Sequence, residues 1–318
     1  MKLKDIGEFG LIDRIYRKPR DKNVLVGIGD DAAVVKMGGK LMLVTTDTMV
    51  EGDHFSFDYF TPEQVGMKAI EVNVSDIGAM GGRPKYALVS LVLQNEMDVS
   101  VIDGIYKGMR KSGDLHGVDI IGGNITHGKQ LVIDIDMIGE VNNRELCLRG
   151  DAKPGDFILV TGDLGASTAG LNLFLNKIKG HNEVKGKHVE PKAKLHKVRP
   201  FLGHINAMID VSDGLASEVG HICEQSGTGA VIYKDNIPIK DETRRAAEEV
   251  GKDPYDYALY GGEDFELVFT VSEKNLRKVR GFLVGEITKR KGLFLYEKGK
   301  ESRIKGNGYD HFKKKNKK

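Results

Sequence analysis

Short apolar runs alternate with turn residues through the first fifty positions of the chain. Runs at 24–26, 32–35 and 41–46 are separated by Gly29-Asp30-Asp31 and by Gly38-Gly39. Aliphatic and β-branched runs of this length, bounded by glycine and aspartate, are typical of strands. The pattern therefore predicts a meander of strands over residues 24–50.

A helix is predicted to follow, over residues 62–80. Thr61 offers an N-cap, Pro62 takes the first helical position and Gln64 completes a capping box. Gly81-Gly82, just before a proline, gives a stop signal. Both ends of the helix are thus marked in the sequence.

One face of this predicted helix combines apolar residues with a carboxylate. Val65, Ala69, Val72 and Asp76 follow one another at spacings of four, three and four residues, which places them on one stripe. That stripe should face the core. A carboxylate on the buried side needs a partner, so Asp76 becomes a candidate functional residue.

The remaining pattern divides the chain into two halves. Residues 86–93 and 131–138 are predicted strands, 101–116 a helix, and 120–121 leads into a glycine turn at 122–123, so the first half is α+β. From the strand at 157–161 onward, strand, turn and helix alternate, which predicts an α/β second half. It includes a glycine turn at 162–165, a helix end and surface loop over 176–200, and a strand-loop-helix unit at 207–223. We place the domains at 1–147 and 148–312, followed by a disordered lysine-rich tail at 313–318.

Composition excludes several classes of protein. No apolar run approaches the roughly 20 residues needed to span a bilayer, and the N-terminal residues lack the apolar segment of a signal peptide. The two cysteines, Cys147 and Cys223, form no metal-ligand spacing. We therefore expect a protein of the reducing cytoplasm that does not enter membranes.

The charge balance argues against a nucleic-acid partner. The chain has 48 basic and 46 acidic residues, so its net charge is 48 − 46 = +2. Five lysines lie in the tail at 313–318, which leaves −3 for the rest. Such a body is no basic platform for nucleic acid, and a short terminal lysine run is usually a solubilising end.

Five short acidic segments carry the candidate chemistry. Each pairs carboxylates with hydroxyl groups or glycines, and hard oxygen ligands of this kind suit magnesium rather than zinc. A single acidic turn is more often a cap or an Asx-turn, but five of them in strand-loop settings favour a metal and phosphate site. The segments lie at 29–31, 45–47, 73–76, 210–214 and 261–264.

The common nucleotide-binding and hydrolytic signatures are absent from the sequence. There is no Gly-x4-Gly-Lys-Ser/Thr stretch and no protein-kinase catalytic loop. Ser167 and Ser212 lack a Gly-x-Ser-x-Gly frame, which disfavours a hydrolase. The glycines at 122–123 and 162–165 are candidates to present backbone N–H groups to phosphate.

Seven segments, taken in chain order, carry a resemblance that covers nearly the whole sequence. They are GIGDDAA at 27–33, TTDT at 45–48, GDHF at 52–55, NVSDIGAMG at 73–81, IDVSDGL at 209–215, GGEDFEL at 261–267 and GYDHF at 308–312. Together they resemble the thiamine-monophosphate kinases, members of the ATP-binding superfamily of aminoimidazole ribonucleotide synthetase. The resemblance implies an α+β N-terminal domain that binds ATP and magnesium, an α/β C-terminal domain, and a homodimer joined through the N-terminal sheets.

The resemblance also assigns roles to individual residues. The implied magnesium ligands are Asp30 in an assisting role, Asp31, Thr45, Thr46, Asp47, Asp76, Asn124, Asp210 and Asp213. The implied ATP contacts are Tyr106, Gly123, Asn124, Arg149 and Ser212, and the implied contacts with thiamine monophosphate are His54, Glu263 and Tyr309.

One position departs from the family pattern. The usual Gly-Gly-Asp reads Gly122-Gly123-Asn124 here, and asparagine keeps one ligating oxygen but loses the charge. This change predicts a weaker metal site at 124, or a greater reliance on Asp47, which is expected beside it.

The implied reaction is ATP-dependent, magnesium-assisted conversion of thiamine monophosphate to thiamine diphosphate. A phosphate monoester is already ionised near pH 7, because its second pKa is about 6, so no general base is required. The expected mechanism is direct in-line transfer in which metal ions offset the repulsion between two anions. A cationic thiazolium would be attracted to Glu263 and to the ring of Tyr309, while His54 or Arg149 would neutralise phosphate.

Two alternatives stay open at this point. A sister enzyme such as aminoimidazole ribonucleotide synthetase shares the acidic segments and is distinguished only by the segments at 52–55 and 308–312. The relatives that use a reactive cysteine are disfavoured, because neither Cys147 nor Cys223 is suitably placed. A non-catalytic nucleotide-binding or regulatory module is the second alternative, although all acidic segments but one are intact.

Overall fold

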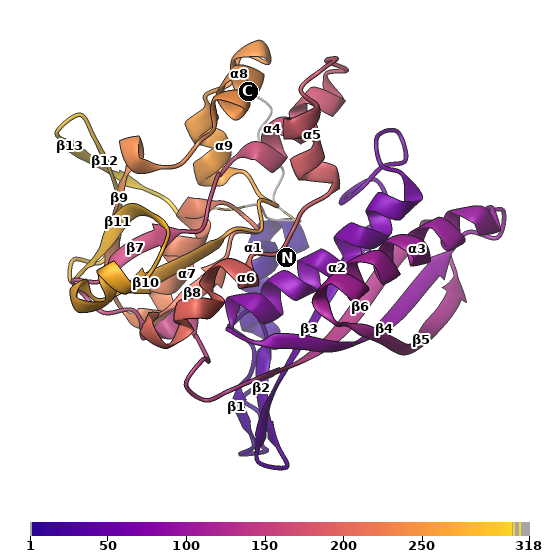
Figure 1. Ribbon diagram of the computed structural model, residues 1–318, viewed down its shortest axis with the longest axis horizontal. Coiled ribbons are helices and arrows are strands. Elements are labelled where there is room, and N and C mark those ends of the chain that lie inside the picture. The colour runs from indigo at the N-terminus through magenta and orange to yellow at the C-terminus, as the bar shows by residue number, and fades with distance from the viewer. Residues whose placement is uncertain (1, 307, 309–311, 313–318) are drawn as a thin grey trace.

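Two sheets, each covered by helices, make up the computed structural model, which describes residues 2–306, 308 and 312 (Figure 1). The first sheet has the strand order β1-β2-β3-β6-β4-β5. Its strands are β1 (Val24–Val26), β2 (Ala33–Met37), β3 (Lys40–Val50), β4 (Arg83–Leu93), β5 (Asp119–His127) and β6 (Val132–Val141). Helices α2 (Pro62–Ala79) and α3 (Val99–His116) cover one face of this sheet (Figure 1).

Helix α2 confirms the helix predicted from its capping signals. The Thr61 side chain accepts a hydrogen bond from the Gln64 backbone, and Gln64 returns one to Thr61, as the capping box requires. Glycines let α2 and α3 approach backbone to backbone. A Cβ on Gly66 would lie 1.8 Å from the carbonyl oxygen of Ile105, and one on Gly108 would lie 1.9 Å from that of Glu63. No larger residue fits at either crossing point.

The second sheet has seven strands in the order β13-β12-β9-β11-β7-β10-β8. They are β7 (Phe157–Val160), β8 (Met208–Asp210), β9 (Gly229–Tyr233), β10 (Leu267–Val271), β11 (Phe282–Thr288), β12 (Gly292–Glu297) and β13 (Lys300–Ile304). Only β9 and β12 pair in parallel among these strands. The helices of this half are α4 (Ala166–Leu175), α5 (Asn182–Val189), α6 (Leu195–Val198), α7 (Leu215–Ser226), α8 (Asp241–Glu249) and α9 (Pro254–Tyr260). Short 3-10 turns also occur: η1 (Arg149–Asp151), η2 (Arg199–His204), η3 (Lys234–Asn236) and η4 (Glu273–Lys278).

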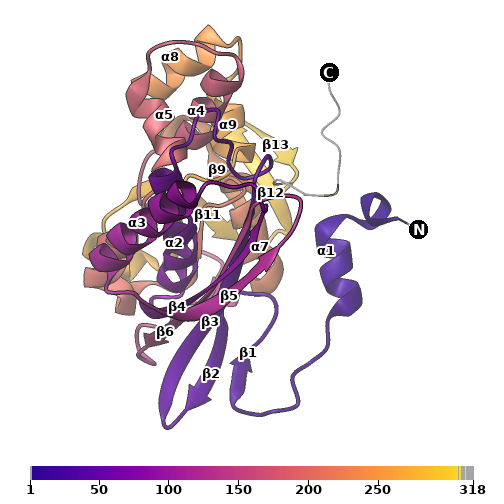
Figure 2. The same ribbon diagram turned by 90° about the vertical axis from the view of Figure 1, so that its right-hand side faces the viewer.

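The structure differs from the sequence-based expectations in three places. The glycines at 122–123 lie inside β5 rather than in a turn, and the polar stretch at 176–200 contains α5 and α6 rather than only a helix end and loop. Helix α1 (Leu3–Ile15), which the pattern did not predict, stands beside the rest of the chain (Figure 2). The lysine-rich tail at 313–318 lies outside the described residues.

Helix α2 lies between the two halves and is buried on nearly every side. Fourteen of its eighteen residues are buried, including the polar residues Lys68, Glu71, Asn73 and Ser75. Val189 from the second half packs into the core under the first sheet. Among the residues that the structure describes, none of the helices is both long and apolar enough to cross a bilayer. Because α2 is shared, its polar residues can bring together groups from both halves.

Candidate active site

Three carboxylates from distant parts of the chain meet beside α2. Asp31 comes from the loop between β1 and β2, Asp76 from α2 and Asp210 from the end of β8. One oxygen from each carboxylate lies within 4.8 Å of the others. We call Asp31, Asp76 and Asp210 the carboxylate cluster. Asp76 therefore lies against two further acids, which increases its need for a partner of opposite charge or a hydrogen-bond donor.

Hydroxyl groups hold two members of the carboxylate cluster in place. The Thr45 hydroxyl on β3 donates to Oδ2 of Asp76 at 2.6 Å and lies 3.1 Å from the backbone carbonyl oxygen of Asp31. The Ser75 hydroxyl donates to Oδ2 of Asp210 at 2.6 Å. Adjacent residues of α2 thus reach into the cluster and fix Asp210 of the other half.

Burial and mutual repulsion raise the proton affinity of the cluster. Burial, followed by the charges of Asp47, Asp210 and Asp31, raises the pKa of Asp76 well above its usual value. Burial and the nearby Asp31 raise the pKa of Asp210 to about 8, and burial raises the pKa of Asp31. Asp47 belongs to this electrostatic group because its charge acts on both Asp76 and Asp210. Carboxylates crowded in this way are stabilised by a bound cation.

Arg149 offsets part of the negative charge of the carboxylate cluster through Asp31 and also contacts the neighbouring Asp30. Its guanidinium pairs with Asp31, and its backbone N–H donates to Asp30 at 3.2 Å. Burial and the charge of Asp31 raise the pKa of Asp30 to about 7. Oδ2 of Asp31 is buried and, among the described residues, accepts no hydrogen bond. A hard divalent cation fits this oxygen-only donor set.

The loop after β8 places two more predicted residues next to the cluster. The backbone N–H of Asp213 donates to Oε1 of Glu218 at 2.8 Å, and the Ser212 carbonyl accepts from the N–H of Glu263 at 2.8 Å. Burial and the charges of Asp213 and Asp210 raise the pKa of Glu218 well above its usual value. Gly214 has φ 109°, and a Cβ there would lie 2.9 Å from the carbonyl oxygen of Gly261. The 261–265 segment therefore packs directly on this loop.

Glu263 lies in a second charged group, in which its charge is matched. Its Oε1 is 2.6 Å from Nζ of Lys68, which is 1% exposed, and its Oε2 is 3.3 Å from Nδ1 of His188. Burial favours the neutral acid, but the charges of Lys68 and His188 hold the pKa of Glu263 below its usual value. Burial, with Lys68 nearby, lowers the pKa of His188 to about 4. We call Lys68, His188 and Glu263 the compensated cluster.

The compensated cluster joins the loop that carries His54. Nζ of Lys68 donates to the His54 carbonyl at 2.9 Å and lies 5.3 Å from the ring centroid of Phe60. Tyr59 stacks on Phe174 with 4.8 Å between centroids. His54 and Glu263, both predicted to contact thiamine monophosphate, are thus brought to one region. Tyr309 lies outside the described residues.

Four other predicted residues do not lie at the carboxylate cluster within one chain. Thr46 is exposed, on the face of β3 opposite Thr45. Asn124 aligns with Ser90, Ser90 with Asp134, and Asp134 with Thr48. Three strand spacings of about 4.8 Å put Asn124 about 14 Å from β3. The expectation that Asn124 lies beside Asp47 is therefore wrong for a single chain.

The two remaining residues of this set, Gly123 and Tyr106, are equally remote. Gly123 precedes Asn124 on β5. Tyr106 follows Ile105, which contacts α2 at Gly66. Gly66 is ten residues before Asp76, or about 15 Å along the helix. Of the implied ATP contacts, a single chain therefore brings only Arg149 and Ser212 to the cluster.

Comparisons with known proteins agree with this architecture. The family model for the AIR synthase related protein N-terminal domain matches residues 29–141, and the model for the C-terminal domain matches residues 153–298. The thiamine-monophosphate kinase of Aquifex aeolicus is 36% identical over 98% of this chain and 100% of its own length. The chain belongs to the thiamine-monophosphate kinase family. The Bacillus subtilis member is 39% identical over 84% of each chain.

A solved structure of the same family matches the whole fold. The structure described as "AaThiL complexed with AMPPCP and TMP" has a TM-score of 0.88 and 36% identity, and the match covers 98% of this chain and 99% of that one. The predicted two-domain fold class is therefore confirmed. A structure of the hydrogenase maturation protein HypE in complex with ATP has a TM-score of 0.70 at 19% identity, and this likeness shows the fold alone.

Sequence reasoning missed four polar residues of this region. Lys68 and Ser75 on α2, His188 on α5 and Glu218 on α7 are all buried. The signal for the first two was present, because charged and hydroxyl residues in a helix with few exposed positions must find partners. His188 lay in a stretch taken for a surface loop. Glu218 resembled an ordinary acidic residue in a first helical turn.

Proposed function

We propose that this protein transfers the γ-phosphoryl group of ATP to the phosphate of thiamine monophosphate and forms thiamine diphosphate and ADP. The observation that carries the proposal is the carboxylate cluster, built from three distant segments in a chain that shares fold and 36% identity with a protein solved with AMPPCP and TMP. The two free, buried cysteines support a reducing, cytoplasmic setting.

The chain's own residues suit magnesium at this site. Asp31, Asp76 and Asp210 would hold the ions, with Thr45, Asp47 and Asp213 around them and Asp30 assisting through Arg149. When bound, magnesium supplies charge neutralisation for the phosphoryl oxygens. The burial of three carboxylates with Arg149 as their paired cation supports this assignment, because a metal ion would offset the repulsion that remains among them.

The remaining residues position the two substrates. Arg149, which pairs with Asp31, would contact phosphate oxygens of ATP, as would Ser212 on the loop that carries Asp213. His54 and Glu263 would contact thiamine monophosphate, with Tyr309 as a further contact. Because the acceptor phosphate is already ionised near pH 7, no residue needs to remove a proton, which favours direct in-line transfer.

We further propose that a second copy of the chain covers the open face of the first sheet. Among the described residues, α2 and α3 cover one face of this sheet, and α1 stands apart from the other face (Figures 1 and 2). Val44 on β3 is 39% exposed, Tyr86 on β4 43% and Ile125 on β5 65%. Thr46 and Asn124, both implied metal ligands, lie on this face or at its edge. A partner's β5 would bring Gly123 and Asn124 toward the cluster of the first copy, so each site would use both chains.

The domain boundary also stays a proposal. We place it between residues 147 and 148, within the segment at 142–152 that neither family model covers. Most residues of the first core precede this segment, apart from Val189 and Ala193, and most residues of the second core follow it.

A kinase assay tests the main proposal. Purified protein with ATP, magnesium and thiamine monophosphate should form thiamine diphosphate and ADP in equal amounts. Transfer from ATP made chiral at the γ-phosphorus should invert its configuration if transfer is direct, and retention would contradict that step. ADP formed only with an aminoimidazole precursor would move the function to the sister enzyme.

Mixed dimers test the shared site. Asp210→Ala should inactivate the site through its own chain, and Asn124→Arg should inactivate the site of the partner chain. Dimers reassembled from the two variants should recover about a quarter of wild-type activity, because half of them are mixed and each mixed dimer has one intact site. No recovery would mean that Asn124 acts within its own chain, and an active Asn124→Arg homodimer would mean that Asn124 is not part of the site.

A further inference from the structure

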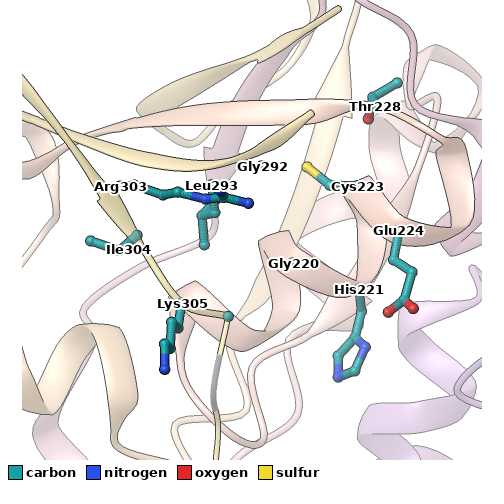
Figure 3. Close-up of a pocket in the computed structure, with 11 residues that line it drawn as sticks. Gly220, His221, Cys223, Glu224, Thr228, Gly292, Leu293, Arg303, Ile304 and Lys305 are labelled. Atoms are coloured by element: carbon teal, nitrogen blue, oxygen red, sulfur yellow. The ribbon is translucent and has the colours of Figure 1, made fainter. Parts of the chain in front are cut away.

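A separate hollow lies on the second half of the molecule, between α7 and the hairpin of β12 and β13. Its volume is about 650 Å³. Helix α7 contributes Gly220, His221, Cys223 and Glu224, and the hairpin contributes Leu293 and Arg303 (Figure 3). Pockets of about 300–1,000 Å³ suit small metabolites. We call it the α7 pocket.

The two cations that line this pocket, Arg303 and Lys305, form no ion pair with a described residue, and Glu224 is the one carboxylate among the lining residues. Arg303 extends from β13 toward α7, and Lys305 stands at the end of the same strand (Figure 3). Residues 289–305 contain seven lysines and arginines against two glutamates. Those glutamates, Glu297 and Glu301, already pair with Lys234 and Arg290. Of the lysines and arginines at 289–305, Arg303 and Lys305 line the pocket and give it positive charge.

The other walls combine apolar surface with one buried hydroxyl group. Leu293 and Ile304 line the pocket, together with the Cys223 side chain. The Thr228 side chain also lines it, is 8% exposed and lies beside the Cys223 thiol. Glu224 and His221 point to a common side, away from Arg303 (Figure 3). A ligand with an anionic end and an apolar body matches this arrangement.

The α7 pocket is distinct from the carboxylate cluster. At about 100° per residue, Gly220, Cys223 and Glu224 lie on the side of α7 opposite Glu218. Glu218 contacts Asp213 beside the carboxylate cluster. The helix itself therefore separates the two places. The chain after β13 connects them, because a Cβ on Gly308 would lie 2.6 Å from that of Asp213.

We propose that the α7 pocket is a second ligand site, for a small organic phosphate that carries an apolar or aromatic ring. The phosphate contacts Arg303 and Lys305, and the ring lies against Leu293 and Ile304. Arginine and lysine are the side chains that bind phosphate most strongly, and two of them without carboxylate partners form a ready anion site. The inference does not depend on the proposed kinase activity.

Calorimetry with three probes tests this site on the full chain. Pyridoxine 5′-phosphate offers an aromatic ring and a phosphate, pyridoxine lacks the phosphate, and inorganic phosphate lacks the ring. The pocket variant is Arg303→Gln with Lys305→Gln. The matched control is Lys289→Gln with Lys300→Gln, which removes the same charge from exposed positions that do not line the pocket.

The expected result separates the two variants. Pyridoxine 5′-phosphate should bind wild type and control with the same Kd, and at least about tenfold more weakly to the pocket variant. Pyridoxine and inorganic phosphate should each bind at least about tenfold more weakly than pyridoxine 5′-phosphate. Equal melting temperatures would show that both variants fold. Equal affinity for both variants, no binding to wild type, or equally tight binding of inorganic phosphate would overturn the proposal.

Discussion

The two charged groups beside α2 differ in how their charge is balanced. In the carboxylate cluster, Asp31, Asp76 and Asp210 repel one another, and one oxygen of Asp31 is buried without a hydrogen bond from a described residue. In the compensated cluster, Glu263 lies between Lys68 and His188. Within the described part of the chain, the first group has only Arg149, which pairs with Asp31, to offset three carboxylates, whereas in the second group Lys68 offsets a single carboxylate. The carboxylate cluster therefore suits a metal ion, and the compensated cluster stabilises the folded chain without a ligand.

The largest expected effect comes from changing one charge in the carboxylate cluster. Asp76→Asn keeps the shape and an acceptor for Thr45 but removes a charge, so phosphoryl transfer should fall by at least about 10³-fold while the fold is retained. The matched control is Asp156→Asn, at a buried carboxylate that accepts from Asn206 at 2.9 Å and lies outside the site. It should lose stability and keep activity. Steady-state kinetics and melting curves measure both, and an active Asp76→Asn enzyme would remove the metal assignment.

The compensated cluster should respond through stability instead. Lys68→Met leaves Glu263 without its ammonium partner, and we expect the free energy of unfolding to fall by about 3 kcal/mol. Adding Glu263→Gln to Lys68→Met should restore at least half of that loss, because the unpaired charge is gone. Denaturant titrations of wild type, Lys68→Met, Glu263→Gln and the double variant give the coupling free energy between Lys68 and Glu263. No recovery in the double variant would mean that Lys68 acts chiefly through packing.

Metal addition should separate the clusters directly. Magnesium at about one hundred times its Kd should stabilise the wild-type protein by about 2.7 kcal/mol. Asp76→Asn should lose most of this gain, and Lys68→Met should keep it. The measurement is unfolding in denaturant with magnesium or with a chelator. Equal gains in both variants would contradict the distinction between the two groups.

The smallest of these effects should be the loss of unfolding free energy at acid pH that arises from His188 in the compensated cluster. The pKa of His188 is about 4 in the folded protein and ordinarily 6.5. Between these values the unfolded chain binds more protons, so stability falls as pH falls, by about 2 kcal/mol at pH 5. His221, whose pKa is also about 4, adds to the same trend. His188→Gln should flatten the curve of unfolding free energy against pH by that amount, and an unchanged curve would contradict this assignment.

Local signals in the sequence were sufficient for much of the fold. The Thr61–Gln64 capping box and the glycines at 81–82 bounded α2 to within one residue. The alternating runs before residue 50 became β1, β2 and β3. The glycines at 122–123 misled, because a paired glycine is typical of turns, whereas here one lets β5 approach β4: a Cβ on Gly123 would lie 1.8 Å from the carbonyl oxygen of Val89.

For the candidate site too, features that depend on neighbouring residues could be predicted from the sequence, and features that depend on distant residues could not. The acidic segments were visible because carboxylates, glycines and hydroxyl groups cluster within a few residues. The pairing of Lys68 with Glu263 was not, since nothing near either residue indicates a partner almost two hundred positions away. The position of Asn124 likewise depends on the strand order β3-β6-β4-β5, which periodicity does not determine.

The enclosed position of α2 also has a consequence for synthesis on the ribosome. The ion pair between Lys68 and Glu263 can form only after Glu263 has been synthesised, and the two residues are 263 − 68 = 195 positions apart in the chain. At 5–20 residues per second, about 10 to 40 s pass between their appearances. During that interval the nascent helix holds a lysine that will later be buried, with no acid to meet it. The surroundings of Lys68 therefore cannot be completed until the second half of the chain has emerged.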